Sequence, residues 1–148
     1  TKRLVTERFT LTGSISSKKN SRINTVRNGR VLSFPNKSYT QKLKGFIEEI
    51  QTQWVGKSIE VPCIISFEFY TPHDSWSKEL LNTGKITKFK GADIDNKVTS
   101  VLDILVTGGF LKDDSLVVQL NACKFPGRKL EGEFGCRCVI AYEVDNAL

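Results

Sequence analysis

The chain has 148 residues, of which 39% are hydrophobic, so it can bury the core of a single domain without disulfides or a structural metal. No run approaches the roughly 20 apolar residues of a membrane span, and Lys2-Arg3 are not followed by an apolar signal segment, so we expect a soluble, cytoplasmic protein. The single histidine, His73, excludes histidine-rich metal sites and is expected in a loop.

The net charge of +6 is unevenly distributed along the chain. Residues 1–45 hold eleven Lys or Arg and one acid, Glu7, whereas the remainder holds eleven basic residues and fifteen acids. Such a basic segment is typical of a protein with a polyanionic partner, because lysine and arginine placed near phosphates release condensed counterions. We expect the partner to be nucleic acid; the alternative is a merely solvated basic surface.

The first half of the chain predicts a strand, a basic connection, a helix and a second strand. Apolar residues alternate over residues 5–11, and the polar stretch 13–37 is a loop or a basic hairpin with Asn28-Gly29 as its turn. Apolar residues at steps of three and four predict a helix over residues 38–54, and unbroken alternation predicts a strand over residues 59–69.

The second half predicts a mobile excursion over residues 71–92, with a short helix near residues 75–81. Apolar positions 98, 101, 102 and 105 then indicate a helix that starts near Asp95 and ends before Gly108-Gly109. Strands are expected at residues 116–120 and 134–144. This order predicts an α/β fold of the α+β type, a small mixed β-sheet covered by two helices, as a single domain over residues 1–148.

Four cysteines are present, and two of them, Cys136 and Cys138, lie on one face of the last predicted strand. Without a second close pair they lack the usual spacing of a zinc site, and nothing in the chain points to secretion. We therefore expect reduced, buried thiols.

Acidic residues flank the second predicted helix. Asp93 and Asp95 precede it and Asp113-Asp114 follow it, where a short reversal would return the latter pair toward the same corner. Three carboxylates that converge in this way would suit Mg²⁺, which prefers oxygen ligands and activates water for attack on a phosphodiester. Spacing alone also allows an ordinary helix cap and turn.

The acidic residues sit in a longer motif. Residues 91–105 read Gly-Ala-Asp-Ile-Asp-Asn-Lys-Val-Thr-Ser-Val-Leu-Asp-Ile-Leu, and residues 109–118 read Gly-Phe-Leu-Lys-Asp-Asp-Ser-Leu-Val-Val. This pattern resembles the signature of the RusA family of Holliday junction resolvases, without insertion, and residues 16–20 (Ser-Ser-Lys-Lys-Asn) are similar to the loop after that family's first strand.

The resemblance implies a RusA-like fold and an endodeoxyribonuclease that resolves four-way DNA junctions in recombination and repair, using Mg²⁺ with Mn²⁺ as a substitute. It assigns Asp93, Asp95 and Asp114 as the catalytic, metal-binding residues, with Asp113 as a neighbour. Asp103 lies within the helix, two turns after Asp95, and is expected to be structural; the alternative is a supporting role beside the metal-binding residues. The resemblance further implies a homodimer, branched DNA as the partner, and a bacterial, phage or prophage origin.

One position departs from the family pattern. A functional lysine is expected four residues after the second aspartate, where this chain has Thr99. Lys90, Lys97 and Lys112 lie near the acidic residues and are candidates for the missing charge. The residues expected to contact DNA phosphates are Lys18, Lys19, Asn20, Arg22, Arg27, Arg30 and Lys97.

Two alternatives remain open from the sequence. The chain could be a nucleic-acid-binding module without catalysis, with Phe67, Phe69 and Tyr70 as a stacking surface and the acidic cluster as a helix cap. It could also be a nuclease for other branched DNA, such as flaps or forks. A small-molecule phosphohydrolase fits poorly, because the chain lacks a phosphate-cradling glycine loop.

Overall fold

The structure is a computed structural model that describes residues 1–15, 22–27, 29–35, 37–71, 93–126 and 134–146. Several predictions therefore lie outside the described residues, namely the excursion after residue 71 with His73 and its short helix, and the positions of Lys18, Lys19, Asn20 and Lys90. Within the described ranges, no helix is long and apolar enough to cross a membrane.

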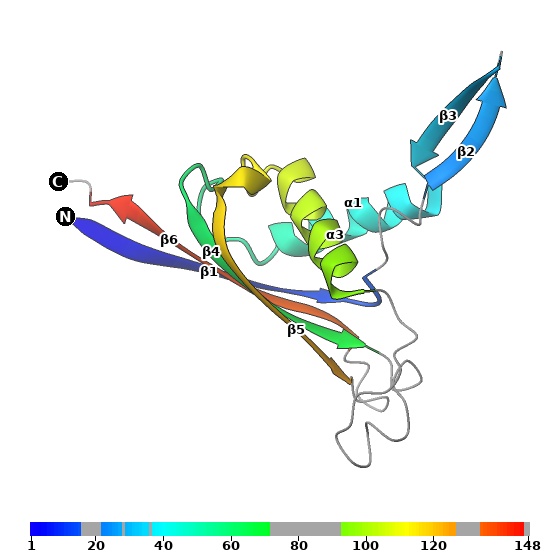
Figure 1. The fold of residues 1–148 in the computed structure, drawn as a ribbon. Coiled ribbons are helices and arrows are strands. Elements are labelled where there is room, and N and C mark those ends of the chain that lie inside the picture. Colours follow the sequence, from blue (N-terminus) through cyan, green and yellow to red (C-terminus); the bar gives the residue numbers. More distant parts are fainter. Residues whose placement is uncertain (16–21, 28, 36, 72–92, 127–133, 147–148) are drawn as a thin grey trace.

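Four strands form one mixed sheet in the order β1-β6-β4-β5. The strands are β1 (Lys2–Thr12), β4 (Cys63–Thr71), β5 (Val117–Pro126) and β6 (Gly135–Asp145). β6 is antiparallel to both β1 and β4, whereas β4 and β5 are parallel. Two helices, α1 (Lys37–Gln51) and α3 (Ile94–Thr107), lie over one face of this sheet (Figure 1). The predicted α+β fold is confirmed.

Alternation in β4 places the core between the sheet and the helices. Cys63, Ile65, Phe67 and Phe69 are all buried, while the residues between them are more exposed. The alternation had predicted a strand that begins at Ile59, but the strand begins at Cys63. Proline at position 62 has no N–H to donate to a ladder, and Ile59 makes only an isolated parallel bridge to Leu111.

The basic stretch after β1 contains a hairpin, one of its two predicted forms. β2 (Arg22–Arg27) pairs antiparallel with β3 (Arg30–Pro35), and the Arg27–Arg30 register leaves a two-residue turn. Gly29 has φ of 74°, the left-handed conformation that such turns require. In Figure 1 this hairpin stands away from the sheet, beyond the start of α1.

A buried carboxylate fixes the connection that follows α1. Glu7, on the core-facing side of β1, is 3% exposed and accepts hydrogen bonds from the backbone N–H groups of Val55 (3.2 Å) and Gly56 (2.6 Å). A Cβ at position 56 would lie 2.6 Å from Glu7 Oε1, so a larger residue there would displace the Glu7 carboxylate. The acid in the first strand is therefore a structural residue.

All four cysteines are free thiols, as predicted. Cys63, Cys136 and Cys138 are buried, as predicted, whereas Cys123 on β5 is exposed, so the prediction of a buried thiol was wrong for this residue. Burial raises the pKa of the Cys136 thiol to about 12, so this thiol stays protonated and unreactive at neutral pH.

Candidate active site at the start of α3

Two exposed carboxylates mark the beginning of α3. Asp93 is the N-cap residue, with extended backbone (φ −62°, ψ 151°), and its side chain makes no capping hydrogen bond. Asp95 follows in the first turn, and both residues are exposed. The interpretation of Asp93 as a side-chain helix cap therefore does not hold. Its carboxylate and that of Asp95 are hard oxygen donors of the kind Mg²⁺ prefers, so the pair fits this ion.

Two lysines, Lys97 and Lys124, lie near this acidic pair. Lys97 belongs to the core-facing side of α3 and is only 6% exposed, and its ammonium donates a hydrogen bond to the carbonyl of Ile15 (3.3 Å). Burial lowers the pKa of Lys97, and the neighbouring charge of Lys124 lowers it further. Lys124, on β5, also has a pKa lowered by burial, opposed by the negative charge of Asp93. Three charged groups thus interact where α3 meets β5.

One member of the second acidic pair, Asp113, has a local structural role. Asp113 caps the 3₁₀ helix η3 (Asp114–Leu116), where its carboxylate accepts a hydrogen bond from the Ser115 N–H (2.8 Å). This backbone hydrogen bond lowers the pKa of Asp113. Asp114 is exposed at the first position of η3. The geometry agrees with Asp113 as a neighbour of the candidate ligand Asp114.

Asp114 does not join Asp93 and Asp95 within one chain, contrary to the expected convergence. Asp93 is the N-cap of α3 and η3 follows the other end of this helix. A helix of 14 residues separates its ends by roughly 21 Å. Consistently, the described residues contain no group of three His, Cys, Asp or Glu side chains that could hold a metal ion. The chain reverses at the far end of the helix and must run along β5 before it returns.

The other predicted site residues are dispersed. Thr99 is exposed and its hydroxyl donates to the Asp95 carbonyl (2.9 Å), so it does not substitute for a cation. Lys112 is exposed next to Asp113, at the end of α3 away from Asp93. Arg30 is exposed at the tip of the β2–β3 hairpin, on the strand that pairs with the one carrying Arg22 and Arg27.

The aromatic surface of the binding-module alternative is absent from the described structure. Phe67 and Phe69 stack at 5.5 Å inside the core, 2% and 0% exposed, and cannot receive a base. Tyr70 faces the other side of the sheet, where it stacks on Phe125 at 5.7 Å beneath the Arg137 guanidinium. The prediction of Phe67 and Phe69 as a stacking surface was therefore wrong.

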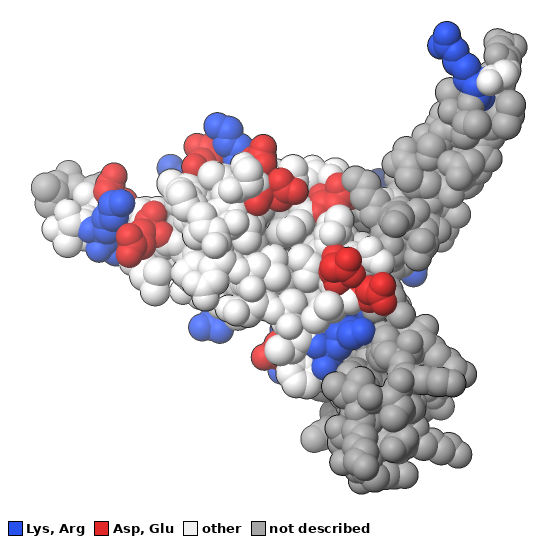
Figure 2. Space-filling model, in the orientation of Figure 1, with Lys and Arg blue, Asp and Glu red and all other residues white. Residues whose placement is uncertain are grey.

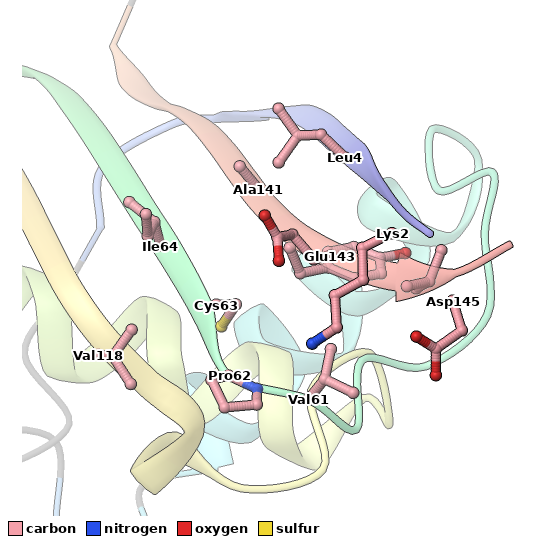
Figure 3. Close-up of a pocket in the computed structure, with 12 residues that line it drawn as sticks. Lys2, Leu4, Val61, Pro62, Cys63, Ile64, Val118, Ala141, Glu143 and Asp145 are labelled. Atoms are coloured by element: carbon pink, nitrogen blue, oxygen red, sulfur yellow. The ribbon is translucent and has the colours of Figure 1, made fainter.

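A groove of about 490 Å³ lies on the uncovered face of the sheet, lined by the start of β1, the start of β4 and the end of β6. Figure 3 shows that its lining includes the apolar residues Leu4, Ile64 and Val118 together with the charged residues Lys2, Glu143 and Asp145. The groove lies where β4 and β5 start, whereas Lys124, whose charge interacts with that of Asp93, lies near the end of β5. The groove is therefore remote from Asp93. The groove is not part of the candidate active site.

On the face of the molecule seen in Figure 2, acidic side chains lie directly beside basic ones near the lower end of α3. Carboxylates for a cation and cations for phosphates are the groups that a metal-dependent phosphodiesterase brings together.

Comparison with protein families identifies the nuclease class. The model of the family described as endodeoxyribonuclease RusA matches residues 12–132. The chain therefore belongs to the RusA family of Holliday junction resolvases, as the motif from Gly91 to Val118 had predicted. A search of curated proteins gave no match.

Lys124 is the site residue that sequence reasoning missed. The predicted strand stopped at residue 120, whereas β5 continues to Pro126. In the parallel register Lys124 is the partner of Phe69, a core-facing residue of β4, so the lysine also faces the helices. A lysine at a core-facing position of a strand was the available signal, and it required the strand boundary to be recognised.

Proposed function

We propose that this chain is a magnesium-dependent, structure-selective endodeoxyribonuclease that resolves four-way DNA junctions in recombination and repair. The observation that carries the proposal is the exposed Asp93–Asp95 pair at the start of α3, with Asp93 uncommitted to capping and with Lys124 beside it. Family membership supplies the class of reaction, and the basic segment with its projecting hairpin fits a DNA partner.

In this proposal Asp93 and Asp95 hold the magnesium ion, and Mn²⁺ can replace it. A magnesium ion held there would supply Lewis acidity at the scissile phosphate and would make the attacking water more acidic. The water oxygen forms a bond to phosphorus and gives up a proton to solvent, the bond from phosphorus to the 3′ oxygen breaks, and the leaving oxygen takes up a proton from solvent. Asp93 and Asp95 orient this site, while cationic side chains offset the charge of the phosphate.

Asp114 enters the proposal through a homodimer. Within one chain it lies at the other end of α3, so it can complete the Asp93–Asp95 site only from a second copy. A two-fold dimer arranged in this way would carry two composite sites, and its symmetry would match the symmetry of a four-way junction. The dimer therefore joins the third aspartate to the other two and pairs two cuts on one substrate.

Cleavage of synthetic DNA substrates tests this proposal. The wild-type protein should cut a four-way junction in Mg²⁺ or Mn²⁺ and not in EDTA, and should cut it faster than a flap, a fork or a linear duplex of the same sequence. Faster cleavage of flaps or forks would reassign the substrate to other branched DNA. Junction binding without cleavage of any substrate would instead support the binding-module alternative.

A further inference from the structure

The two lysines near the Asp93–Asp95 pair, Lys97 and Lys124, differ in how deeply they are buried. Lys97 is almost fully buried and its ammonium is fixed by the Ile15 carbonyl. Lys124 is only partly buried, and its charge interacts with both Lys97 and Asp93. A lysine on the core-facing side of a helix is unusual, because burying an ammonium costs free energy unless the charge has a function or a partner.

The surroundings of Lys97 increase this cost. The charged neighbour of Lys97 is Lys124, which carries the same sign of charge. The nearby Cys136 thiol stays protonated, because burial raises its pKa, and so supplies no negative charge. Packing alone would be served better by an apolar side chain at position 97, next to the buried Val101 and Ile104. Two cations held together beside exposed carboxylates instead form a place where an anion is stabilised.

We propose that Lys124 contacts the DNA phosphate held at the Asp93–Asp95 site, and that Lys97 is a positioning residue that keeps Lys124 directed toward it. The inference rests on the proposed nuclease function and names a cation for it. Repulsion from the fixed Lys97 ammonium prevents Lys124 from folding into the core, and attraction to Asp93 draws it to the acidic end of α3. The role of the expected lysine at position 99 thereby falls to a residue on β5.

The phosphate contact is tested with Lys124→Met and Lys124→Arg, with Lys57→Met as a control because Lys57 is exposed in the loop after α1. Single-turnover junction cleavage should fall about 100-fold in Lys124→Met and less than about 10-fold in Lys124→Arg, with no change in Lys57→Met. In EDTA, the slope of log affinity against log salt should become shallower by about 1 for Lys124→Met alone.

Cleavage by Lys124→Met within twofold of wild type, or an unchanged salt slope, would overturn the contact. The two measurements separate this inference from the nuclease proposal. If the wild-type protein cuts no DNA, the nuclease proposal fails, and the salt slope in EDTA still decides whether Lys124 contacts a phosphate.

The positioning role of Lys97 is tested by a double-mutant cycle. Lys97→Met should slow cleavage about 10-fold, and the Lys97→Met/Lys124→Met protein should be no slower than Lys124→Met, because Lys97 acts through Lys124. Multiplied effects in the double variant would contradict this role. Lys97→Gln keeps a donor for the Ile15 carbonyl without the charge, and should be as slow as Lys97→Met. Wild-type activity of Lys97→Gln would show that the hydrogen bond to Ile15, and not the charge, is what matters. Thermal melting should show Lys97→Met to be at least as stable as wild type.

Discussion

Tyr39 and Asp103 join the two helices through a side-chain hydrogen bond. The Tyr39 hydroxyl on α1 donates to the Asp103 carboxylate on α3 at 2.9 Å, in a partly buried position. This contact agrees with the structural role expected for Asp103. It fixes α3, and with it the acidic start of the helix, against α1.

Tyr39→Phe should lower the free energy of unfolding by about 1 kcal/mol at pH 7, the usual net contribution of such a hydrogen bond. Burial, followed by Asp103, raises the pKa of Tyr39 above the ordinary 10.0. The unfolded chain therefore ionises first, so the contribution is complete below pH 10 and is lost as the pH rises above it. Urea unfolding at pH 7 and pH 11 measures both effects.

Tyr70→Phe is the matched control, because the Tyr70 hydroxyl donates to Glu68 at an exposed position. It should change the free energy of unfolding by less than about 0.5 kcal/mol. A Tyr39→Phe protein as stable as this control, or a difference between Tyr39→Phe and wild type that does not shrink at pH 11, would contradict the assigned contact.

Among the elements, the basic connection between β1 and α1 is expected to bind the DNA backbone. Replacing Lys18 or Lys19 by Ala should make the plot of log junction affinity against log salt shallower by about 1 for each lysine, because each phosphate contact releases condensed counterions. Fluorescence anisotropy titrations at several salt concentrations measure this slope. Lys57→Ala is the control and should leave the slope unaltered; equal slopes for all variants would remove this segment from the interface.

Local patterns were sufficient to predict most elements. Steps of three and four residues gave both helices, and the stop at Gly108-Gly109 is present, with Gly109 at a φ of 78°. The strand ends were less well predicted, because ladder pairing sets them: β4 starts after Pro62, and β5 extends beyond residue 120 as the neighbour of β4. That extension is what brings Lys124 to the site.

At the scale of the whole molecule, the acidic motif could be assigned from sequence but its spatial arrangement could not. The interval between Asp95 and Asp114 contains one helix and one turn. A chain that leaves a helix at its far end cannot bring the next carboxylate back within so few residues. The 14-residue helix α3 therefore holds the third aspartate away from the first two within one chain.

A mixing experiment tests whether two copies share a site. Asp95→Asn and Asp114→Asn proteins, each expected to be inactive, are unfolded and refolded together. A mixed dimer would pair the intact Asp93–Asp95 of one copy with the intact Asp114 of the other, so about a quarter of the sites should recover. Measured cleavage that stays at the level of the separate variants would show that Asp114 is not shared between copies.

Single-turnover cleavage of a four-way junction by Asp95→Asn, compared with Asp145→Asn at the exposed end of β6, tests the central claim most directly. In Mg²⁺, Asp95→Asn should be at least about 100-fold slower than wild type while its junction affinity in EDTA is retained, and Asp145→Asn should cut at the wild-type rate. Wild-type cleavage by Asp95→Asn, or equal cleavage by the wild-type protein with and without magnesium, would contradict the assignment of the active site to the start of α3.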